Sequence, residues 1–120
     1  MTEKLLENSL LTIWNDRNPA SRLVAMSQVY AADIIFYETN EGQAIIGYEA
    51  INELIAGLQS QWPSEFEFEL IGPARVNHQV QHIAWRLGIP GQAPAATGMD
   101  VALIDHDKIK SLHLFLDIPS

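Results

Sequence analysis

The sequence predicts an α+β domain in which helices come first and an antiparallel sheet follows. In the first half of the chain, apolar residues recur every three or four positions around one short β-branched run, whereas beyond Pro63 they recur every second position. The chain has 120 residues and 48% apolar content, which is enough for one hydrophobic core and too little for two domains. We therefore predict a single domain over residues 1–120, with a cup and a pocket between the helices and the sheet.

Two amphipathic helices are predicted at the start of the chain. The first begins after Thr2, a residue type suited to an N-cap, and ends near Asn15. Its apolar stripe consists of Leu6, Leu10, Ile13 and Trp14. The second begins at Asn18 and Pro19, because asparagine caps a helix and proline at the first position gives up an N–H that has no partner there. Its buried face is predicted to contain Leu23, Met26 and Tyr30.

A short strand and a third helix follow. Residues 34–38 are mostly β-branched or aromatic and predict a strand, which a polar turn connects to a brief strand at 44–46. Gly47 opens the helix with the clearest periodicity in the chain, and Pro63 ends it. The apolar face of this helix consists of Ile51, Leu54, Ile55, Leu58 and Trp62.

The remainder of the chain predicts an antiparallel sheet. In the strand 65–70, phenylalanine or leucine alternates with glutamate, so one face is buried and the other is in water. After a turn at Gly72 and Pro73, strands are predicted at 75–87, 97–104 and 109–118, with a Gly/Pro/Ala loop and a polar turn between them. In the 75–87 strand, His78 and His82 would lie on one face about 13 Å apart, too far to share a metal ion, and no metal site is expected.

The composition argues against several classes of function. The 15 acidic and 7 basic residues give a net charge of −8, which repels nucleic-acid phosphates and anionic lipid headgroups. We expect neither a signal peptide nor a membrane span, and with no cysteine we expect a cytoplasmic protein without disulfides. Motifs for nucleotide cofactors and for a serine nucleophile are absent, so we expect any catalysis to be cofactor-free acid–base chemistry.

The last two predicted strands are apolar on both faces. Only Asp100 interrupts the apolar run at 99–103, and leucines alternate with His113 and Phe115 in the final strand. A sheet that packs on helices with one face is expected to present polar residues on the other, so the apolar second face indicates that a partner covers it. We predict a homodimer formed through the sheet, with His113 as an interior or interface residue.

Several short motifs resemble one family. They are a Trp-Asn at the end of the first helix, a Tyr-Ala-Ala-Asp before the first strand, a glycine that opens the third helix, and a closing pattern Gly-x-Asp … Asp-x-x-Lys-Ile … Phe-x-Asp. From about Leu5 to Asp117, their order resembles the nuclear transport factor 2-like superfamily, and within it the SnoaL-like polyketide cyclases and the ketosteroid isomerases. The resemblance implies a cystatin-like cone, in which three N-terminal helices pack on a curved antiparallel or mixed sheet around an apolar ligand.

The resemblance also implies roles for two acids. Glu38 matches the position of the general base of the ketosteroid isomerases, and Asp100 matches their protonated acid, which donates a hydrogen bond to the developing oxyanion. Those isomerases also use a tyrosine on the first helix, whereas the corresponding stretch here, Leu10 to Ile13, offers only Thr12 as a side-chain donor. This difference argues against steroid isomerisation.

Independently of the family, Asp100 is an unusual residue, because an acid in an apolar strand loses its hydration unless it is protonated or paired. Asp100 is therefore either part of a site or a structural acid, one that accepts hydrogen bonds from a backbone loop or pairs with Arg75 or Arg86. Glu38 shares a strand face with Phe36, which would direct it into the same cavity as Asp100. The alternative is that Glu38 belongs to a solvated strand end.

The walls of the predicted pocket are drawn from aromatic residues and leucines. The candidate ligand-binding residues are Trp14, Tyr30, Phe36, Trp62, Trp85, Leu114 and Leu116. The same side chains are also suited to an ordinary hydrophobic core, so both interpretations stay open.

Three functions follow as hypotheses. The leading one is a SnoaL-like pocket protein that binds a small, largely apolar molecule and transfers a proton next to a carbonyl group, with Glu38 as base and Asp100 as acid. The alternative is a non-catalytic ligand-binding or dimerisation module of the same fold. The third is an adaptor that binds another protein through the exposed sheet.

Overall fold

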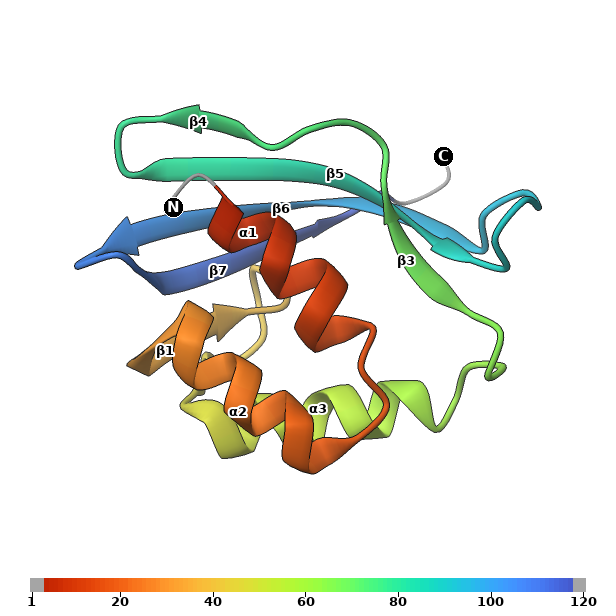
Figure 1. Cartoon of the computed structure of the whole chain (residues 1–120), viewed down its shortest axis with the longest axis horizontal. Coiled ribbons are helices and arrows are strands. Elements are labelled where there is room, and N and C mark those ends of the chain that lie inside the picture. The colour runs from red at the N-terminus through yellow and green to blue at the C-terminus, as the bar shows by residue number, and fades with distance from the viewer. Residues whose placement is uncertain (1–3, 118–120) are drawn as a thin grey trace.

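A computed structural model describes residues 4–117, and in it a mixed sheet packs on a layer of helices (Figure 1). The helical elements are α1 (Leu5–Asn8), η2 (Ser9–Trp14), α2 (Pro19–Val29) and α3 (Tyr48–Gln59). The strands are β1 (Tyr30–Tyr37), β2 (Ile45–Ile46), β3 (Glu67–Leu70), β4 (Arg75–Asn77), β5 (Val80–Gly88), β6 (Ala96–Asp105) and β7 (Lys108–Leu116). This is the predicted α+β architecture, a cone of three N-terminal helices on a curved sheet.

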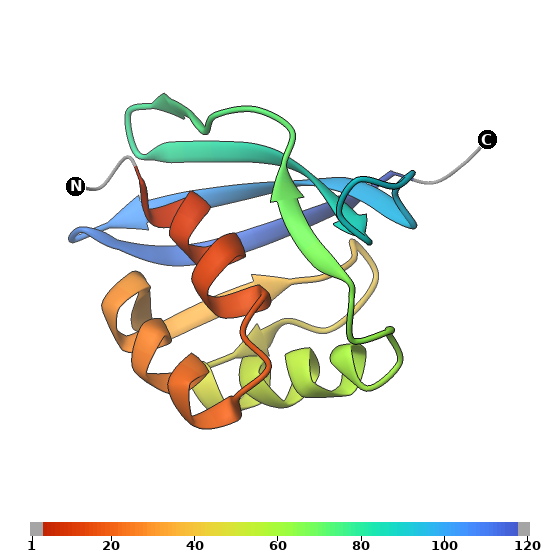
Figure 2. The same cartoon turned by 45° about the vertical axis from the view of Figure 1, so that its right-hand side comes forward.

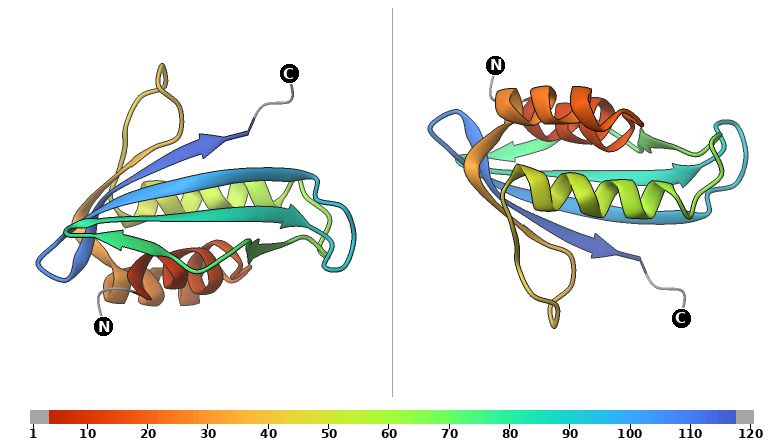
Figure 3. Two further views of the ribbon diagram at one scale, coloured as in Figure 1. Left: turned by 90° about the horizontal axis from the view of Figure 1, so that it is seen from above. Right: turned by 90° about the horizontal axis from the view of Figure 1, so that it is seen from below.

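The strand order explains the shape of the cone. Strands run β2-β1-β7-β6-β5-β3, with β4 paired to β5, and only the β1–β7 pair among these described strands is parallel. At the two sides of the central strands, β1 and β3 bend toward the helices, so the sheet wraps around them (Figures 1 and 2). The views from above and below show the helical elements together on one side of β5 and β6 (Figure 3).

The first two helices differ from the prediction at their ends. The predicted N-cap, Thr2, lies outside the described residues, and the second half of the first helix, η2, is wound as a wider π-helix. Asn18 caps α2 as predicted, because its side-chain oxygen accepts hydrogen bonds from the backbone N–H groups of Ala20 and Ser21 at 2.9 and 3.2 Å. The prediction that Tyr30 belongs to this helix is wrong, since its backbone is extended and begins β1.

The predicted long strand 75–87 is in fact a hairpin. His78, with a φ of 53°, turns the chain between β4 and β5, and Arg75 pairs with His82 across the hairpin. His78 and His82 therefore do not share a strand face. The turn residues at 77–79 do not include a glycine. The sequence therefore lacks the residue type that usually marks a hairpin turn with a left-handed backbone conformation.

The other boundaries differ by a few residues. The first strand begins at Tyr30 rather than 34 because parallel pairing with β7 extends it, and the last strand ends at Leu116, while Ile118 lies outside the described residues. Gly47, with a φ of 91°, precedes α3, which ends at Gln59, so Trp62 lies in the following turn. On α3, Ile51 and Ile55 are fully buried.

A buried polar cluster fixes α2 against α3. Arg22 is fully buried, and its guanidinium donates hydrogen bonds to Asn52 Oδ1 at 2.5 Å and to Gln59 Oε1 at 2.7 Å. The same group donates to the backbone carbonyl of Asp16 at 2.7 Å. These hydrogen bonds join α2 to α3 and help to set their spacing, while Arg22 Nη2 is buried without a hydrogen-bond partner among the described residues. Burial lowers the pKa of Arg22, and the nearby Asp16 opposes this effect.

None of the helices in residues 4–117 is long and apolar enough to cross a membrane.

Candidate functional site

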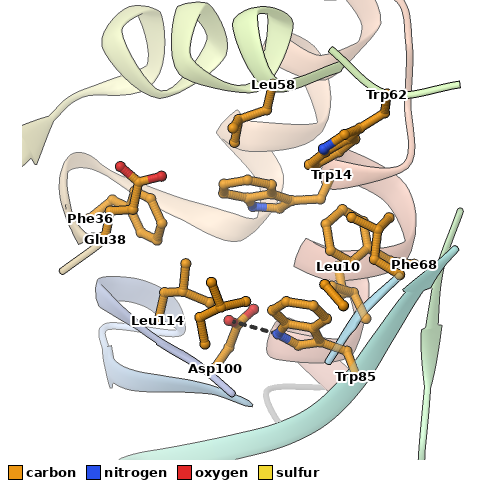
Figure 4. A pocket seen from close by; sticks show the side chains of 13 residues that line it. Leu10, Trp14, Phe36, Glu38, Leu58, Trp62, Phe68, Trp85, Asp100 and Leu114 are labelled. Atoms are coloured by element: carbon orange, nitrogen blue, oxygen red, sulfur yellow. Dashed lines mark hydrogen bonds between the residues drawn. The ribbon is translucent and has the colours of Figure 1, made fainter. Parts of the chain in front are cut away.

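A cavity of about 250 Å³ lies between η2, the C-terminal part of α3 and the inner face of the sheet. Its wall is mostly aromatic and aliphatic, and two carboxyl groups, those of Glu38 and Asp100, are the acids in it (Figure 4). Among the described residues that line the cavity, none is a lysine, arginine or histidine. The cavity therefore combines an apolar surface with acidic groups, a lining suited to a small, largely apolar ligand.

Five aromatic side chains form a connected wall: Trp14, Phe36, Trp62, Phe68 and Trp85. Phe68 is at its centre, because its ring contacts Trp62 and Trp85 edge-on, with centroid distances of 5.7 and 5.2 Å. On the other side of the wall, the ring of Trp14 contacts the ring of Phe36, with a distance of 5.4 Å between their centroids. The edge-on contacts of Phe68 favour fixed relative orientations of the rings in this wall.

Asn15 explains why β3 brings Phe68 to this place. Its side chain acts as a short piece of strand, accepting a hydrogen bond from the backbone N–H of Phe68 at 2.7 Å and donating one to the carbonyl of Phe68 at 2.9 Å. The end of the first helix thereby supplies both a wall residue, Trp14, and the side chain that binds the backbone of β3, Asn15. Phe68 is not among the predicted pocket residues, although the alternation around it indicates an inward-facing side chain.

Asp100 lies on the inner face of β6 with only 6% of its surface exposed. Its Oδ1 accepts a hydrogen bond from Trp85 Nε1 at 3.0 Å. Burial raises the pKa of Asp100 to about 7, against the smaller opposing effect of the Trp85 hydrogen bond. Near neutral pH the group is therefore divided between a neutral acid, which can donate a hydrogen bond into the cavity, and a carboxylate.

The alternative that Asp100 is a structural partner of an arginine does not agree with this geometry. Arg86 lies one residue from Trp85 and so on the opposite face of β5, where its Nε is 3.5 Å from Glu69 Oε1. Arg75 is exposed on β4. In residues 4–117 the hydrogen-bond partner of the Asp100 carboxyl is an indole, which leaves its charge uncompensated.

Glu38 follows the last residue of β1 and lines the same cavity. It is half-buried, in contrast to the nearly inaccessible Asp100. In Figure 4 the two carboxyl groups lie apart, with Glu38 beside Phe36 and Asp100 beside Trp85. The structure thus brings both predicted acids to one cavity, in different parts of its wall and in different degrees of burial.

Of the seven predicted ligand-binding residues, six line the cavity: Trp14, Phe36, Trp62, Trp85, Leu114 and Leu116. Tyr30 does not. Its fully buried hydroxyl instead lies 2.5 Å from Ser9 Oγ and accepts a hydrogen bond from Trp14 Nε1 at 3.2 Å. Tyr30 supports the Trp14 ring from behind, and burial raises the pKa of its hydroxyl. Leu10 and Leu58 also line the cavity, although neither is among the predicted ligand-binding residues; both belong to the predicted apolar faces of their helices.

A metal ion has no evident place in the described part of the chain, where no group of three or more histidine, aspartate or glutamate side chains is arranged to hold one. The chemistry that this site offers is that of its two carboxyl groups. A neutral Asp100 can donate a proton or a hydrogen bond, and a charged Glu38 can accept a proton.

Comparison with known proteins gives matches among solved structures. No family model and no curated protein matches the chain. A proposed isomerase of the SnoaL-like family from Agrobacterium tumefaciens has a TM-score of 0.83 and 21% identity, with 98% of each chain covered. A proposed SnoaL-like polyketide cyclase from Jannaschia has a TM-score of 0.77 and 12% identity, over 97% of this chain and 85% of that one.

A third similar structure contains a ligand. It is a protein with a ketosteroid isomerase-like fold from Catenulispora acidiphila in complex with trimethylamine, with a TM-score of 0.73 and 17% identity over 96% of this chain and 86% of the other. Identities this low show a shared fold and leave the chemistry open. The chain therefore has the fold of the nuclear transport factor 2-like superfamily, shared with SnoaL-like and ketosteroid isomerase-like proteins, as its sequence motifs predict.

Proposed function

We propose that this protein binds a small, largely apolar molecule with a carbonyl group and transfers a proton next to that carbonyl. The observation that carries the proposal is Asp100, a buried carboxyl in the wall of an aromatic cavity, whose pKa burial raises to about 7. An acid that stays partly neutral near pH 7 can donate a hydrogen bond to a carbonyl oxygen as negative charge develops on it.

Glu38 is the proposed base. Its half-buried carboxyl lines the cavity, so it can reach a ligand and, once protonated, exchange that proton with water. The step moves one proton from the carbon next to the carbonyl to Glu38, and the electron pair left on carbon delocalises into an enolate whose oxygen accepts a hydrogen bond from neutral Asp100. Return of the proton to the same or a neighbouring conjugated carbon completes an isomerisation and needs no cofactor.

Hydrogen–deuterium exchange tests this step without knowledge of the natural substrate. 2-Tetralone is a small, largely apolar ketone, and its protons between the ring and the carbonyl are acidic. We expect the protein to accelerate their exchange in D₂O, followed by proton NMR, and Glu38→Gln to abolish the acceleration. The matched control is Glu67→Gln, which removes an acid at an exposed position on β3. Exchange no faster than with the Glu38→Gln variant would refute the proposed reaction for this ketone class.

A second candidate function is a non-catalytic ligand-binding module, favoured by the separation of the two carboxyl groups in Figure 4. Its ligand chemistry would be that of a small amine, because the cavity has aromatic walls and two acids, and the Catenulispora acidiphila neighbour is described in complex with trimethylamine. The pH dependence of affinity distinguishes the candidates. Below pH 7, an amine binds more tightly as pH rises and Asp100 loses its proton, whereas a carbonyl ligand bound to the neutral acid weakens as pH rises through 7.

We also propose that two copies of the chain associate through the outer face of the sheet. Asp100 points inward, so its neighbours on β6 point outward, where Met99 pairs with Phe115 and Leu103 pairs with Val80 across the strands. All four are exposed apolar residues. Tyr37 stacks on His113 at 4.8 Å on the same face, which places the histidine within this surface. A dimer would bury this exposed apolar surface.

We propose a cytoplasmic location for the protein, on the basis of its composition.

A further inference from the structure

We infer that Trp85 and Gly98 together position the Asp100 carboxyl, fixing Oδ1 as a hydrogen-bond acceptor and leaving Oδ2 as the oxygen that carries the proton. Trp85 and Gly98 thereby become positioning residues for the proposed acid. The inference rests on the proposed function for its significance, while the geometry and the test concern the carboxyl itself.

The strand register brings the three residues together. Trp85 on β5 is directly opposite Gly98 on β6, and Ile83 is opposite Asp100, so Trp85 and Asp100 are diagonal neighbours on the inner face. The indole crosses above Gly98 to reach Asp100 Oδ1, with a distance of 3.0 Å between Nε1 and the oxygen. An indole N–H is only a donor, so the oxygen that it contacts must act as an acceptor. The proton of the neutral acid therefore resides on Oδ2.

Gly98 provides the space for the indole. A Cβ atom at this position would lie 2.5 Å from Cζ2 and 2.8 Å from Cη2 of Trp85, and 3.0 Å from the backbone oxygen of Phe115. The first two distances are shorter than van der Waals contact, so any side chain at position 98 displaces the ring. The backbone of Gly98 is outside the left-handed region, which means that space rather than backbone conformation requires glycine here.

The indole is also held from its other side. Phe68 contacts it edge-on, with ring centroids 5.2 Å apart and an interplanar angle of 84°. The ring therefore lies between Phe68 and Gly98, and its N–H direction is set by packing. This arrangement makes the hydrogen bond to Asp100 a fixed feature of the cavity wall.

The other titratable groups near Asp100 have different positions. The Tyr30 hydroxyl, from β1, interacts electrostatically with Asp100 and is itself bound to Ser9 and Trp14. Glu38, at the end of β1, lies at another part of the cavity wall. Trp85 thus supplies the hydrogen bond that favours the ionised form of Asp100, while burial favours the neutral form.

An NMR titration of the intact protein tests the coupling without a variant. The ¹H–¹⁵N signal of the Trp85 indole should shift with pH at the same midpoint as the carboxyl carbon of Asp100, because the acceptor changes its charge. The indoles of Trp14 and Trp62 serve as internal controls, since Trp14 donates to Tyr30 instead. A Trp85 indole signal that does not follow the Asp100 titration would overturn the inference.

A double-mutant cycle then tests the role of Gly98. Trp85→Phe should raise the Asp100 pKa by about one pH unit, because a donor to the ionised form is lost. Gly98→Ala should shift it in the same direction by displacing the indole. In the Trp85→Phe background, Gly98→Ala should add little, because phenylalanine lacks the Cζ2 and Cη2 atoms that the new methyl group would contact.

The outcomes separate this inference from the proposed function. An unchanged Asp100 pKa in folded Gly98→Ala, or equal effects of Gly98→Ala in both backgrounds, would overturn the role of Gly98. If Trp85→Phe does not fold, the wild-type indole titration and the Gly98→Ala variant still decide the matter. Failure of ketone exchange with an intact Trp85–Asp100 coupling would refute the proposed reaction and leave the positioning geometry standing.

Discussion

Asp100→Asn should make the protein more stable at neutral and alkaline pH, although it alters a candidate site residue. Burial raises the pKa of Asp100 from 3.8 to about 7 in the folded protein. Between these two pH values the folded state therefore holds a proton that the unfolded state has released. The stabilising effect of the neutral acid is fully present below pH 3.8 and is lost as pH rises through 7. Asparagine resembles the neutral acid at all pH values, and its amide oxygen can still accept the Trp85 hydrogen bond.

The magnitude follows from the shift. About 1.4 kcal/mol for each pH unit over roughly three units gives about 4 kcal/mol, as an order of magnitude, for the difference in unfolding free energy between Asp100→Asn and wild type above pH 7. The difference should be near zero at the acid end of this range. Urea unfolding of both proteins at several pH values, followed by far-UV circular dichroism, measures it.

Subtraction of the two curves removes the other titrating groups. Hydrogen bonds lower the pKa values of Glu7, Asp16 and Asp33. The stability that these three carboxylates contribute is therefore lost as pH falls, which is the opposite of the effect of Asp100. Both proteins contain them, so their contribution cancels in the difference. Glu67→Gln, at an exposed position, controls for the change in net charge. A stability difference that does not change between pH 4 and 8 would refute the reasoning that Asp100 is buried as a neutral acid.

The remaining predictions concern the core, the interface and the base. Ile55→Ala, in the fully buried face of α3, should lower the unfolding free energy by about 2–5 kcal/mol, whereas Glu53→Ala on the exposed face should change it little; similar losses would mean that the helix is misplaced. Met99→Asp should convert a dimer to a monomer in light scattering, while Val24→Asp, exposed on α2, should not; a 13.4 kDa wild-type particle would contradict the dimer. Glu38→Gln should retain binding of 2-tetralone in a ligand-observed NMR titration while it loses exchange, and loss of both would assign Glu38 to binding.

The sequence predicts the elements of this fold where local pattern determines them. The three-to-four-residue period in α3 and the alternation around Phe68 each identify a face before any contact is known. Asp100 stands out for the same reason, since an acid between Met99 and Val101 breaks an apolar strand. Because side chains alternate along a strand, Asp100 lies on the opposite face from Met99 and Val101. The structure shows that its face is the inner one, since Asp100 pairs with the buried Ile83 of β5.

Features that depend on distant residues could not be predicted in this way. Tyr30 starts β1 because the strand pairs in parallel with β7, some 80 positions later in the sequence. Gly98 in a strand indicates close approach of another group, but the identity of that group, Trp85, depends on the register between β5 and β6. The side-chain clamp between Asn15 and Phe68 likewise joins residues from different elements.

Titration of the Asp100 carboxyl carbon by NMR, without ligand and with saturating 2-tetralone, directly measures whether this acid is neutral in the cavity. We predict a midpoint near 7 for the protein alone. The ketone should raise this midpoint, because its carbonyl oxygen accepts a hydrogen bond from the neutral acid and stabilises that form. A midpoint at or below the ordinary value of 3.8, or one that bound ketone lowers, would contradict the account of Asp100 as a neutral hydrogen-bond donor in this cavity.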